Sequence, residues 1–303
     1  MQPKFPDFIG LGVARCGTTW IYDMLMQHPE IAWATANRTI PFCYGFFATA
    51  QLEKEPSFTM KEVNYWSHQF ARQWPSGGQF HYGFAQKAQF MESYKALFGN
   101  ATNGQKAGEA TSNYSFYLLD PEIMKPFRQN MPDVKLFMII RNPIERFISA
   151  HFFQWDNLEE GKRWGLISKG NEPKLDSLKN EINTISARLR QNGPKDPLKL
   201  MGYIMGQYDV AITNILAHYP QKQLATILFD DIKENPDGVL RDLCKFLEID
   251  PDFKFEDIEK PSNVLRTKKR VGEQHRDKLK ELYRPSVKRT GTMLRKNLNH
   301  WLT

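Results

Sequence analysis

A glycine-containing loop near the N-terminus has the composition of an anion-binding site. Residues 12–19 read Gly-Val-Ala-Arg-Cys-Gly-Thr-Thr, between a short apolar run and a stretch with helical spacing. A glycine turn at a helix N-terminus points backbone N–H groups and the positive end of the helix dipole at a ligand. The glycine spacing is that of a nucleoside triphosphatase P-loop, but Thr18 and Thr19 replace its Lys-Ser or Lys-Thr. Unless this is an ordinary strand-to-helix turn, we expect it to bind a phosphate-like group with Arg15 as the cation.

A second motif lies some 125 residues further along the chain, around Arg141 and Ser149. Arg141 follows the apolar run 135–140, which has the composition of a buried parallel strand, and ligands bind at the carboxyl ends of such strands. Ser149 lies two turns into a helix that we expect to begin at Pro143 with Asn142 as its cap. Triphosphatases hold magnesium with an acidic residue at such a strand end. Here that residue is an arginine, so we expect no metal. An arginine at a strand end is usually part of a surface ion pair, but together with the first loop it predicts a site for a terminal phosphate.

In combination, the two motifs resemble those of the sulfotransferases that use 3′-phosphoadenosine 5′-phosphosulfate (PAPS). Residues 12–20 are similar to the family's 5′-phosphosulfate loop, with Arg15 at a position often taken by Lys, and residues 141–149 are similar to its 3′-phosphate motif. Three further segments resemble parts of the family: residues 61–66, where heparan-type members carry an acidic base, residues 108–114, and the closing helix at residues 282–301. The resemblance therefore covers nearly the whole chain.

The resemblance assigns parts of the donor to particular residues. Those implied to bind the 5′-phosphosulfate are Arg15, Cys16, Gly17, Thr18 and Thr19. Arg141 and Ser149 are implied to hold the 3′-phosphate. Trp20 is implied to stack on adenine, with Tyr208 near it, and the alternative for Trp20 is a plain core position. The basic run 266–270 is implied to form a loop that closes over the 3′-phosphate, with Arg266, Lys268 and Lys269 as its binding residues. The alternative for that run is a solvated charged loop.

Glu62 is the expected general base. A hydroxyl or amine attacks a sulfuryl group poorly unless a nearby group takes its proton, and a carboxylate can do so. The alternative is a surface glutamate paired with Lys61. His81 is the reserve candidate, because a histidine near neutral pKa suits the role. Cytosolic family members use a histidine elsewhere, in a region where this chain has none between His81 and His151.

These residues predict an enzyme that moves a sulfuryl group from PAPS, by in-line transfer, to a hydroxyl or amine and releases adenosine 3′,5′-bisphosphate. Ala110 stands where heparan-type members often have lysine, so the best match is the soluble bacterial-type branch that includes natural-product enzymes. The aromatic-rich stretch 33–58 suits a pocket wall, although plain core is an equal reading. We therefore expect a small-molecule acceptor of alkaloid or polyketide type. The alternatives are a saccharide acceptor, a non-catalytic nucleotide-binding module and, less favoured, a P-loop kinase.

Composition sets the broad class. The 303 residues are 41% hydrophobic and 25% charged, as in globular proteins. A net charge of +7 favours anionic partners, but the basic residues are spread out, so no nucleic acid partner is expected. Three widely spaced cysteines indicate a reducing compartment. With no signal peptide and no bilayer-length apolar run, we expect a cytoplasmic protein without a membrane partner. The oligomeric state stays open.

The elements that must position these residues alternate along the chain. Apolar runs predict strands at residues 8–11, 107–110, 135–140 and 224–229. Helices are expected at residues 18–28, 121–130, 208–218 and 236–247, after Pro143, and from about residue 276. This order predicts an α/β fold of three layers, with a mostly parallel sheet between helices and a P-loop-like nucleotide-binding site. We expect a single domain over residues 1–303, with pocket or lid excursions at about 32–60 and 159–200.

Overall fold

The computed structural model describes residues 4–37, 57–63, 65–66, 87–156, 175–190, 200–262 and 271–303. The chain forms two compact units. The first consists of residues 1–13, 17–140 and 214–262, and the second of residues 14–16, 141–213 and 263–303. The expectation of a single domain stays a prediction.

The first unit is built on a five-stranded sheet in which every strand pair is parallel. Its strands, in spatial order, are β2 (Ile31–Trp33), β5 (Lys106–Ala110), β1 (Phe8–Gly10), β6 (Lys135–Ile140) and β7 (Leu224–Leu228). The predicted α/β fold and the four predicted strands are confirmed. Because β2 and β5 lie on one side of β1 whereas β6 and β7 lie on the other, the strand order reverses at the carboxyl ends of β1 and β6. Ligands of open α/β sheets bind at such a reversal.

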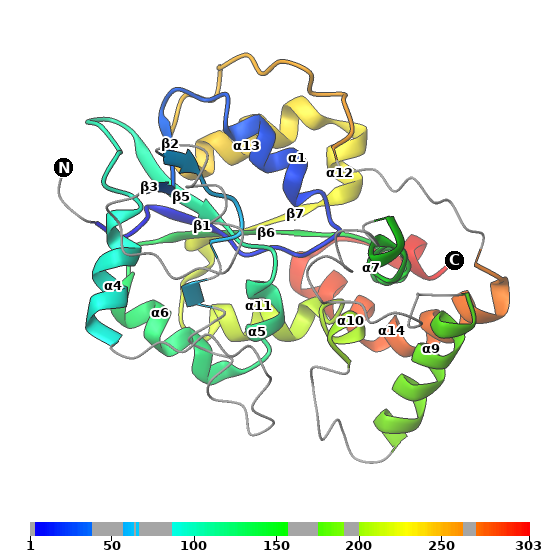
Figure 1. Ribbon diagram of the computed structural model, residues 1–303. Coiled ribbons are helices and arrows are strands. Elements are labelled where there is room, and N and C mark those ends of the chain that lie inside the picture. The colour runs from blue at the N-terminus through cyan, green and yellow to red at the C-terminus, as the bar shows by residue number, and fades with distance from the viewer. Residues whose placement is uncertain are drawn as a thin grey trace. The chain divides into compact units, whose positions relative to one another are not determined.

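Helices cover both faces of this sheet. Figure 1 shows α1 (Thr18–Leu25), α12 (Phe229–Glu234) and α13 (Pro236–Leu247) on one face, and α5 (Tyr114–Tyr117) and α6 (Met124–Asn130) on the other. Leu136 to Ile140 of β6 are therefore almost completely buried. A strand covered on both faces is apolar throughout instead of alternating. This explains why such a short run could be recognised in the sequence.

Several boundaries follow local chemistry. Helix α13 begins after Asn235, whose Oδ1 accepts a hydrogen bond from Gly238 N at 3.0 Å, and Pro236 occupies its first turn. Helix α1 ends at Leu25, three residues before the expected residue 28, and Pro29 follows it. The expected helix 121–130 is a 3₁₀ turn, η1 (Pro121–Ile123), followed by α6. The 3₁₀ turn η3 (Gln221–Gln223) precedes β7, and α4 (Lys87–Ala96) precedes β5.

Part of the expected excursion at residues 32–60 belongs to sheet structure. Residues Ile31–Trp33 form β2, and β3 (Thr35–Asn37) pairs antiparallel with β4 (Ser57–Thr59). Three-residue strands have too little pattern to be recognised alone, because pairing with distant partners decides them.

The second unit is helical. It contains α7 (Pro143–Asp156), α9 (Leu175–Arg190), α10 (Met201–Ile204), most of α11 (Tyr208–Leu216), α14 (Glu273–Leu294) and the 3₁₀ turn η4 (Asn299–Leu302). Helix α7 packs against α10 and α14. As predicted, Asn142 caps α7: its Oδ1 accepts a hydrogen bond from Ile144 N at 3.0 Å, and Pro143 is the first helical residue. Helix α14 begins three residues before the expected position, after Gly272. Within the expected excursion at 159–200, the described residues include the helix α9.

Candidate functional site

The loop after β1 takes a conformation that requires glycine at two positions. Gly12 has φ +114°, and a Cβ there would lie 2.4 Å from the carbonyl oxygen of Ser112. Gly17 has φ +92° and is the N-cap residue of α1, so no capping side chain covers the first-turn N–H groups of Thr18 and Thr19. An eight-residue helix thus presents its N-terminus with backbone donors, as an anion site needs.

In the second unit, the structure brings Arg15, Arg141 and Ser149 together. Arg15 Nε donates a hydrogen bond to Ser149 Oγ at 3.1 Å, and Arg141 Nη1 donates to the carbonyl oxygen of Arg15 at 3.2 Å. The Arg15 guanidinium also lies 4.2 Å from the centroid of the Phe153 ring, one helical turn after Ser149 on α7. Two guanidinium groups and a hydroxyl thus converge from segments 126 residues apart. Guanidinium groups match phosphate oxygens in geometry and charge, so this cluster suits a phosphorylated ligand.

Arg15 and Glu62 share a backbone feature that residue type does not predict. Both have left-handed backbones, with φ 72° at Arg15 and φ 61° at Glu62. Such conformations are unfavourable for residues with a Cβ and gather at functional sites, where surrounding contacts hold them.

Cys16 and Tyr208 support this cluster from the interior. Cys16 Sγ lies 3.9 Å from the Tyr208 hydroxyl, and that hydroxyl donates to the carbonyl oxygen of Arg141 at 2.7 Å. Burial raises the pKa of the Cys16 thiol to about 11, so the thiol is neutral at physiological pH and unsuited to be a nucleophile. Both side chains are almost fully buried. They therefore fix the backbone of the motif.

In the first unit, the expected base lies close to the start of α1. Lys61 Nζ donates to Thr19 Oγ1 at 3.0 Å and lies 3.6 Å from Glu62 Oε1. Ser112 N donates to Glu62 Oε2 at 2.8 Å, and Glu62 N donates to the Ala110 carbonyl oxygen at 2.9 Å. The Glu62 side chain is 32% exposed, so it is held in place while remaining accessible to an acceptor. Lys61 is the residue that sequence reasoning undervalued, because its contact with Thr19 depends on the fold.

Behind Glu62 lies a buried carboxyl that sequence reasoning missed. Glu109, at the end of β5, accepts hydrogen bonds from Tyr94 Oη at 2.5 Å, Tyr114 Oη at 3.1 Å and Thr111 Oγ1 at 3.2 Å. Burial raises the pKa of Glu109 to about 7, although these hydrogen bonds oppose the shift. The network anchors the segment that supplies the N–H donor to Glu62.

Known proteins identify the group to which these features belong. The model of the sulfotransferase family matches residues 6–253. The chain belongs to the sulfotransferase family. The predicted resemblance is thereby confirmed.

Two relatives of the chain also carry sulfotransferase names. Over 255 residues, 84% of the chain, it is 24% identical to the bifunctional heparan sulfate N-deacetylase/N-sulfotransferase 1 of Caenorhabditis briggsae. Over 152 residues, 50% of the chain, it is 26% identical to the membrane-associated sulfotransferase kil1 of Dictyostelium discoideum. Each match covers 24% of the relative's length, so the chain matches only about a quarter of either protein.

A solved structure shares the fold over the whole chain. The sulfotransferase from Alicyclobacillus acidocaldarius superposes with a TM-score of 0.68 at 23% identity, covering 99% of both chains. This agreement confirms the α/β, P-loop-like fold that the sulfotransferase motifs implied.

For the other residues that the sulfotransferase motifs implicated, the predicted contacts with the donor stay predictions. Trp20 is 5% exposed, and its Nε1 donates to the Ile258 carbonyl oxygen at 2.9 Å, so its stacking on adenine stays a prediction. The same holds for a position of Tyr208 near adenine. His81, Arg266, Lys268 and Lys269 lie outside the described residues, and so does Cys43.

Across the described ranges, no group of three or more His, Cys, Asp or Glu side chains is arranged to hold a metal ion. Likewise, none of the helices described has the length and apolar character needed to cross a membrane.

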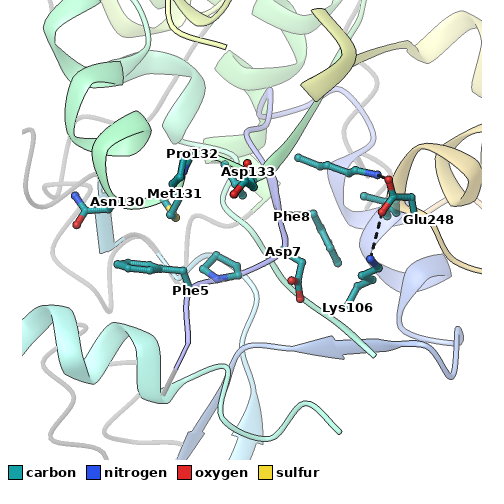
Figure 2. Close-up of a pocket in the computed structure, with 13 residues that line it drawn as sticks. Phe5, Asp7, Phe8, Lys106, Asn130, Met131, Pro132, Asp133 and Glu248 are labelled. Carbon is teal, nitrogen blue, oxygen red and sulfur yellow. Dashed lines mark hydrogen bonds and ion pairs between the residues drawn. The ribbon is translucent and has the colours of Figure 1, made fainter. Parts of the chain in front are cut away.

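A cavity of about 250 Å³ lies beside the amino ends of strands β1, β5 and β6. Figure 2 shows Glu248 near Lys106 at one end of the cavity, with Phe5, Met131 and Pro132 further along it. Glu248 forms ion pairs with Lys106 at 3.3 Å and Lys135 at 2.7 Å. The sulfotransferase motifs lie at the opposite, carboxyl ends of the strands, away from this cavity.

Proposed function

We propose that the chain transfers a sulfuryl group from PAPS to a hydroxyl or amine of a small-molecule acceptor. The observation that carries this proposal is the convergence of Arg15, Arg141 and Ser149. This donor set fits the ligand, because it offers two permanent positive charges and a hydroxyl to a group with several phosphate oxygens. When bound, PAPS supplies an activated sulfuryl group and leaves as adenosine 3′,5′-bisphosphate.

Each residue has a distinct task in this proposal. Arg141 and Ser149 hold the 3′-phosphate, which does not change during the reaction. Arg15 and the first-turn N–H groups of α1 hold the 5′-phosphosulfate. They are fixed donors of the kind that stabilise charge as it develops on a leaving oxygen. Lys61, hydrogen-bonded to Thr19 at 3.0 Å, adds a positive charge beside a loop that lacks the lysine of a triphosphatase loop.

Glu62 completes the proposal as the base. The Ser112 N–H holds Oε2, so that Oε1 faces Lys61 and is the oxygen to receive the acceptor's proton. His81 is the reserve base of the proposal.

The class of acceptor is a second part of the proposal. We favour a small natural product of alkaloid or polyketide type. A saccharide amine or hydroxyl is the second candidate, because the C. briggsae relative, matched over 84% of the chain, is named for heparan sulfate. Ala110, only 7% exposed, lacks the lysine that heparan-type members often have there, which favours the small molecule.

A screen with isotopically labelled PAPS tests the proposal. Pools of phenols, alcohols, alkaloid amines and saccharides are incubated with the protein, and the products are read by mass spectrometry together with release of adenosine 3′,5′-bisphosphate. We expect the label on a small molecule. A product confined to the saccharide pool would select the second acceptor class. Tight binding of adenosine 3′,5′-bisphosphate without transfer to any pool would indicate a non-catalytic binding module instead.

A further inference from the structure

The second unit contains a fully buried arginine that the family motifs leave without a task. Arg146 lies on α7 between Arg141 and Ser149, and its side chain is 0% exposed. Its Nη2 donates to the carbonyl oxygen of Gly202, and the Tyr283 hydroxyl is a further hydrogen-bonding partner. Its buried Nε has no partner among the described residues.

No carboxylate of the described part of the chain lies within 4.0 Å of the Arg146 guanidinium. Three carboxylates on the surrounding helices are engaged elsewhere: Glu145 with Arg276, Asp209 with Arg289 and Glu181 with His151. Arginine keeps its proton in proteins, so burial does not remove this charge. A buried charge with neutral partners alone is costly for a folded protein. A ligand of opposite charge would offset that cost.

The position of Arg146 relates it to the 3′-phosphate motif. Ser149 follows it by three residues and therefore lies on the same side of α7. The Cys16 thiol is within electrostatic range of both Arg146 and Arg141, and it contacts the Tyr208 hydroxyl at 3.9 Å. Cys16 and Tyr208, both buried, therefore lie within electrostatic range of the Arg146 charge. In such an environment, charges act over longer distances than they do in water.

We propose that Arg146 is a positioning residue of the donor site, whose buried charge has the phosphate held by Arg141 and Ser149 as its counter-ion. The identity of that phosphate rests on the proposed function. Arg146 then strengthens donor binding from behind the motif without touching the ligand. It also keeps the α7 segment that carries Ser149 in place through Gly202 and Tyr283.

The test compares variants that separate the charge from the packing. Arg146→Gln keeps an amide donor for the Gly202 carbonyl but removes the charge, whereas Arg146→Lys keeps the charge. Arg241→Gln removes the same charge from an exposed ion pair with Asp252 and is the matched control. For each protein, the affinity for adenosine 3′,5′-bisphosphate is measured by calorimetry, and the melting temperature is measured without ligand.

We expect Arg146→Gln to bind adenosine 3′,5′-bisphosphate about tenfold or more weakly, with an unchanged or higher melting temperature without ligand. Arg146→Lys and Arg241→Gln should bind within about threefold of the unaltered protein. The proposal is overturned if Arg146→Gln binds within twofold of the unaltered protein, if the lysine variant is as weak as the glutamine variant, or if the glutamine variant does not fold.

Failure of the proposed function gives a different pattern. In that case the unaltered protein does not bind adenosine 3′,5′-bisphosphate, and inorganic pyrophosphate is used as the probe in the same variants. Stabilisation by pyrophosphate that is lost in Arg146→Gln and kept in Arg146→Lys supports the role of Arg146. Stabilisation that is equal in both variants, or absent from the unaltered protein, contradicts it.

Discussion

At the scale of single residues, the Glu62 carboxylate is held in place by its neighbours and is still partly exposed to solvent. One carboxylate oxygen is held by Ser112 N and the other lies 3.6 Å from Lys61 Nζ, while a third of the side chain is exposed. A group placed in this way can take a proton from an incoming acceptor without first reorganising. The left-handed backbone of Glu62 indicates that this placement is imposed by its surroundings.

We expect Glu62→Gln to lower turnover by roughly a hundredfold or more, because glutamine keeps the shape and loses the basicity. Affinity for adenosine 3′,5′-bisphosphate should be unchanged in the same variant. Steady-state kinetics and calorimetry measure the two effects. Glu92→Gln, at a glutamate with 63% side-chain exposure, is the control and should behave as the unaltered protein does. Near-normal turnover in Glu62→Gln with a collapse in His81→Ala would move the base to the histidine.

The two arginines of the donor cluster should respond differently to removal. Arg15→Ala should mainly lower turnover, because its contact strengthens as charge develops on the leaving oxygen. Arg141→Ala should mainly weaken donor binding, by roughly tenfold to a hundredfold, since it removes charge-assisted hydrogen bonds to a phosphate that does not react. Kinetics and calorimetry on both variants provide the measurement. Effects of the same size on both constants in both variants would refute this division of tasks.

The hydrogen bond between Arg15 and Ser149 means that substitutions at these two residues should affect each other. Because Arg15 Nε donates to Ser149 Oγ, the two residues belong to one network and their effects should not be additive. Ser149→Ala and the Arg15→Ala/Ser149→Ala double variant measure this coupling.

At the scale of elements, the loop between β1 and α1 depends on close backbone contact. We expect Gly12→Ala to lower the free energy of unfolding by about 2–4 kcal/mol, because the new Cβ would lie 2.4 Å from the Ser112 carbonyl oxygen. Gly104→Ala is the matched control, since Gly104 also has positive φ but a Cβ there meets nothing within 4 Å. It should cost about 1–2 kcal/mol, the cost of a left-handed residue alone. Equal losses in denaturant unfolding would show that the contact with Ser112 has no effect.

The buried carboxyl of Glu109 in β5 should make the free energy of unfolding depend on pH. The pKa of Glu109 is raised from 4.5 to about 7, so the folded protein binds this proton more tightly than the unfolded chain does. The stabilisation is complete below the unfolded value and is lost as pH rises through that range to about 7. Glu109→Gln cannot lose a proton. Its stability relative to the unaltered protein should therefore rise by about 3 kcal/mol between pH 4 and pH 8.

Denaturant titrations at several pH values measure this difference. Glu122→Gln, at an exposed glutamate, should show no comparable trend. A difference between Glu109→Gln and the unaltered protein that stays constant with pH would contradict the assignment.

Elements with a strong local signal could be predicted from the sequence. The run at residues 135–140 was recognisable because a strand covered on both faces is apolar throughout, and α7 was recognisable from Asn142 and Pro143. Strand β2 was not recognised, because three residues carry little pattern and pairing with β5 determines their structure.

The same distinction applies to the candidate site. The types and spacing of Arg15, Arg141, Ser149 and Glu62 could be found in the sequence. The contact of Lys61 with Thr19 spans 42 residues and depends on tertiary packing. The burial of Glu109 and Arg146 could not be anticipated either, since charged residues are almost always exposed unless paired.

At the scale of the whole molecule, the structure comprises two units of different character. The first has a parallel sheet with Glu62, Lys61 and the N-terminus of α1, and the second is helical with Arg15, Arg141 and Ser149. The short segment 14–16 belongs to the second unit, although the chain on both sides of it belongs to the first. One loop therefore supplies residues to both units.

The most direct test of the central claim is a calorimetric titration with adenosine 3′,5′-bisphosphate in the presence of excess chelator. ATP with magnesium, and the Arg141→Ala and Arg241→Ala variants, are measured in parallel. The account predicts tight binding of the bisphosphate, weaker binding of ATP, and a loss of roughly tenfold or more in Arg141→Ala but not in Arg241→Ala. No binding of the bisphosphate, or equally tight binding of magnesium ATP, would contradict it.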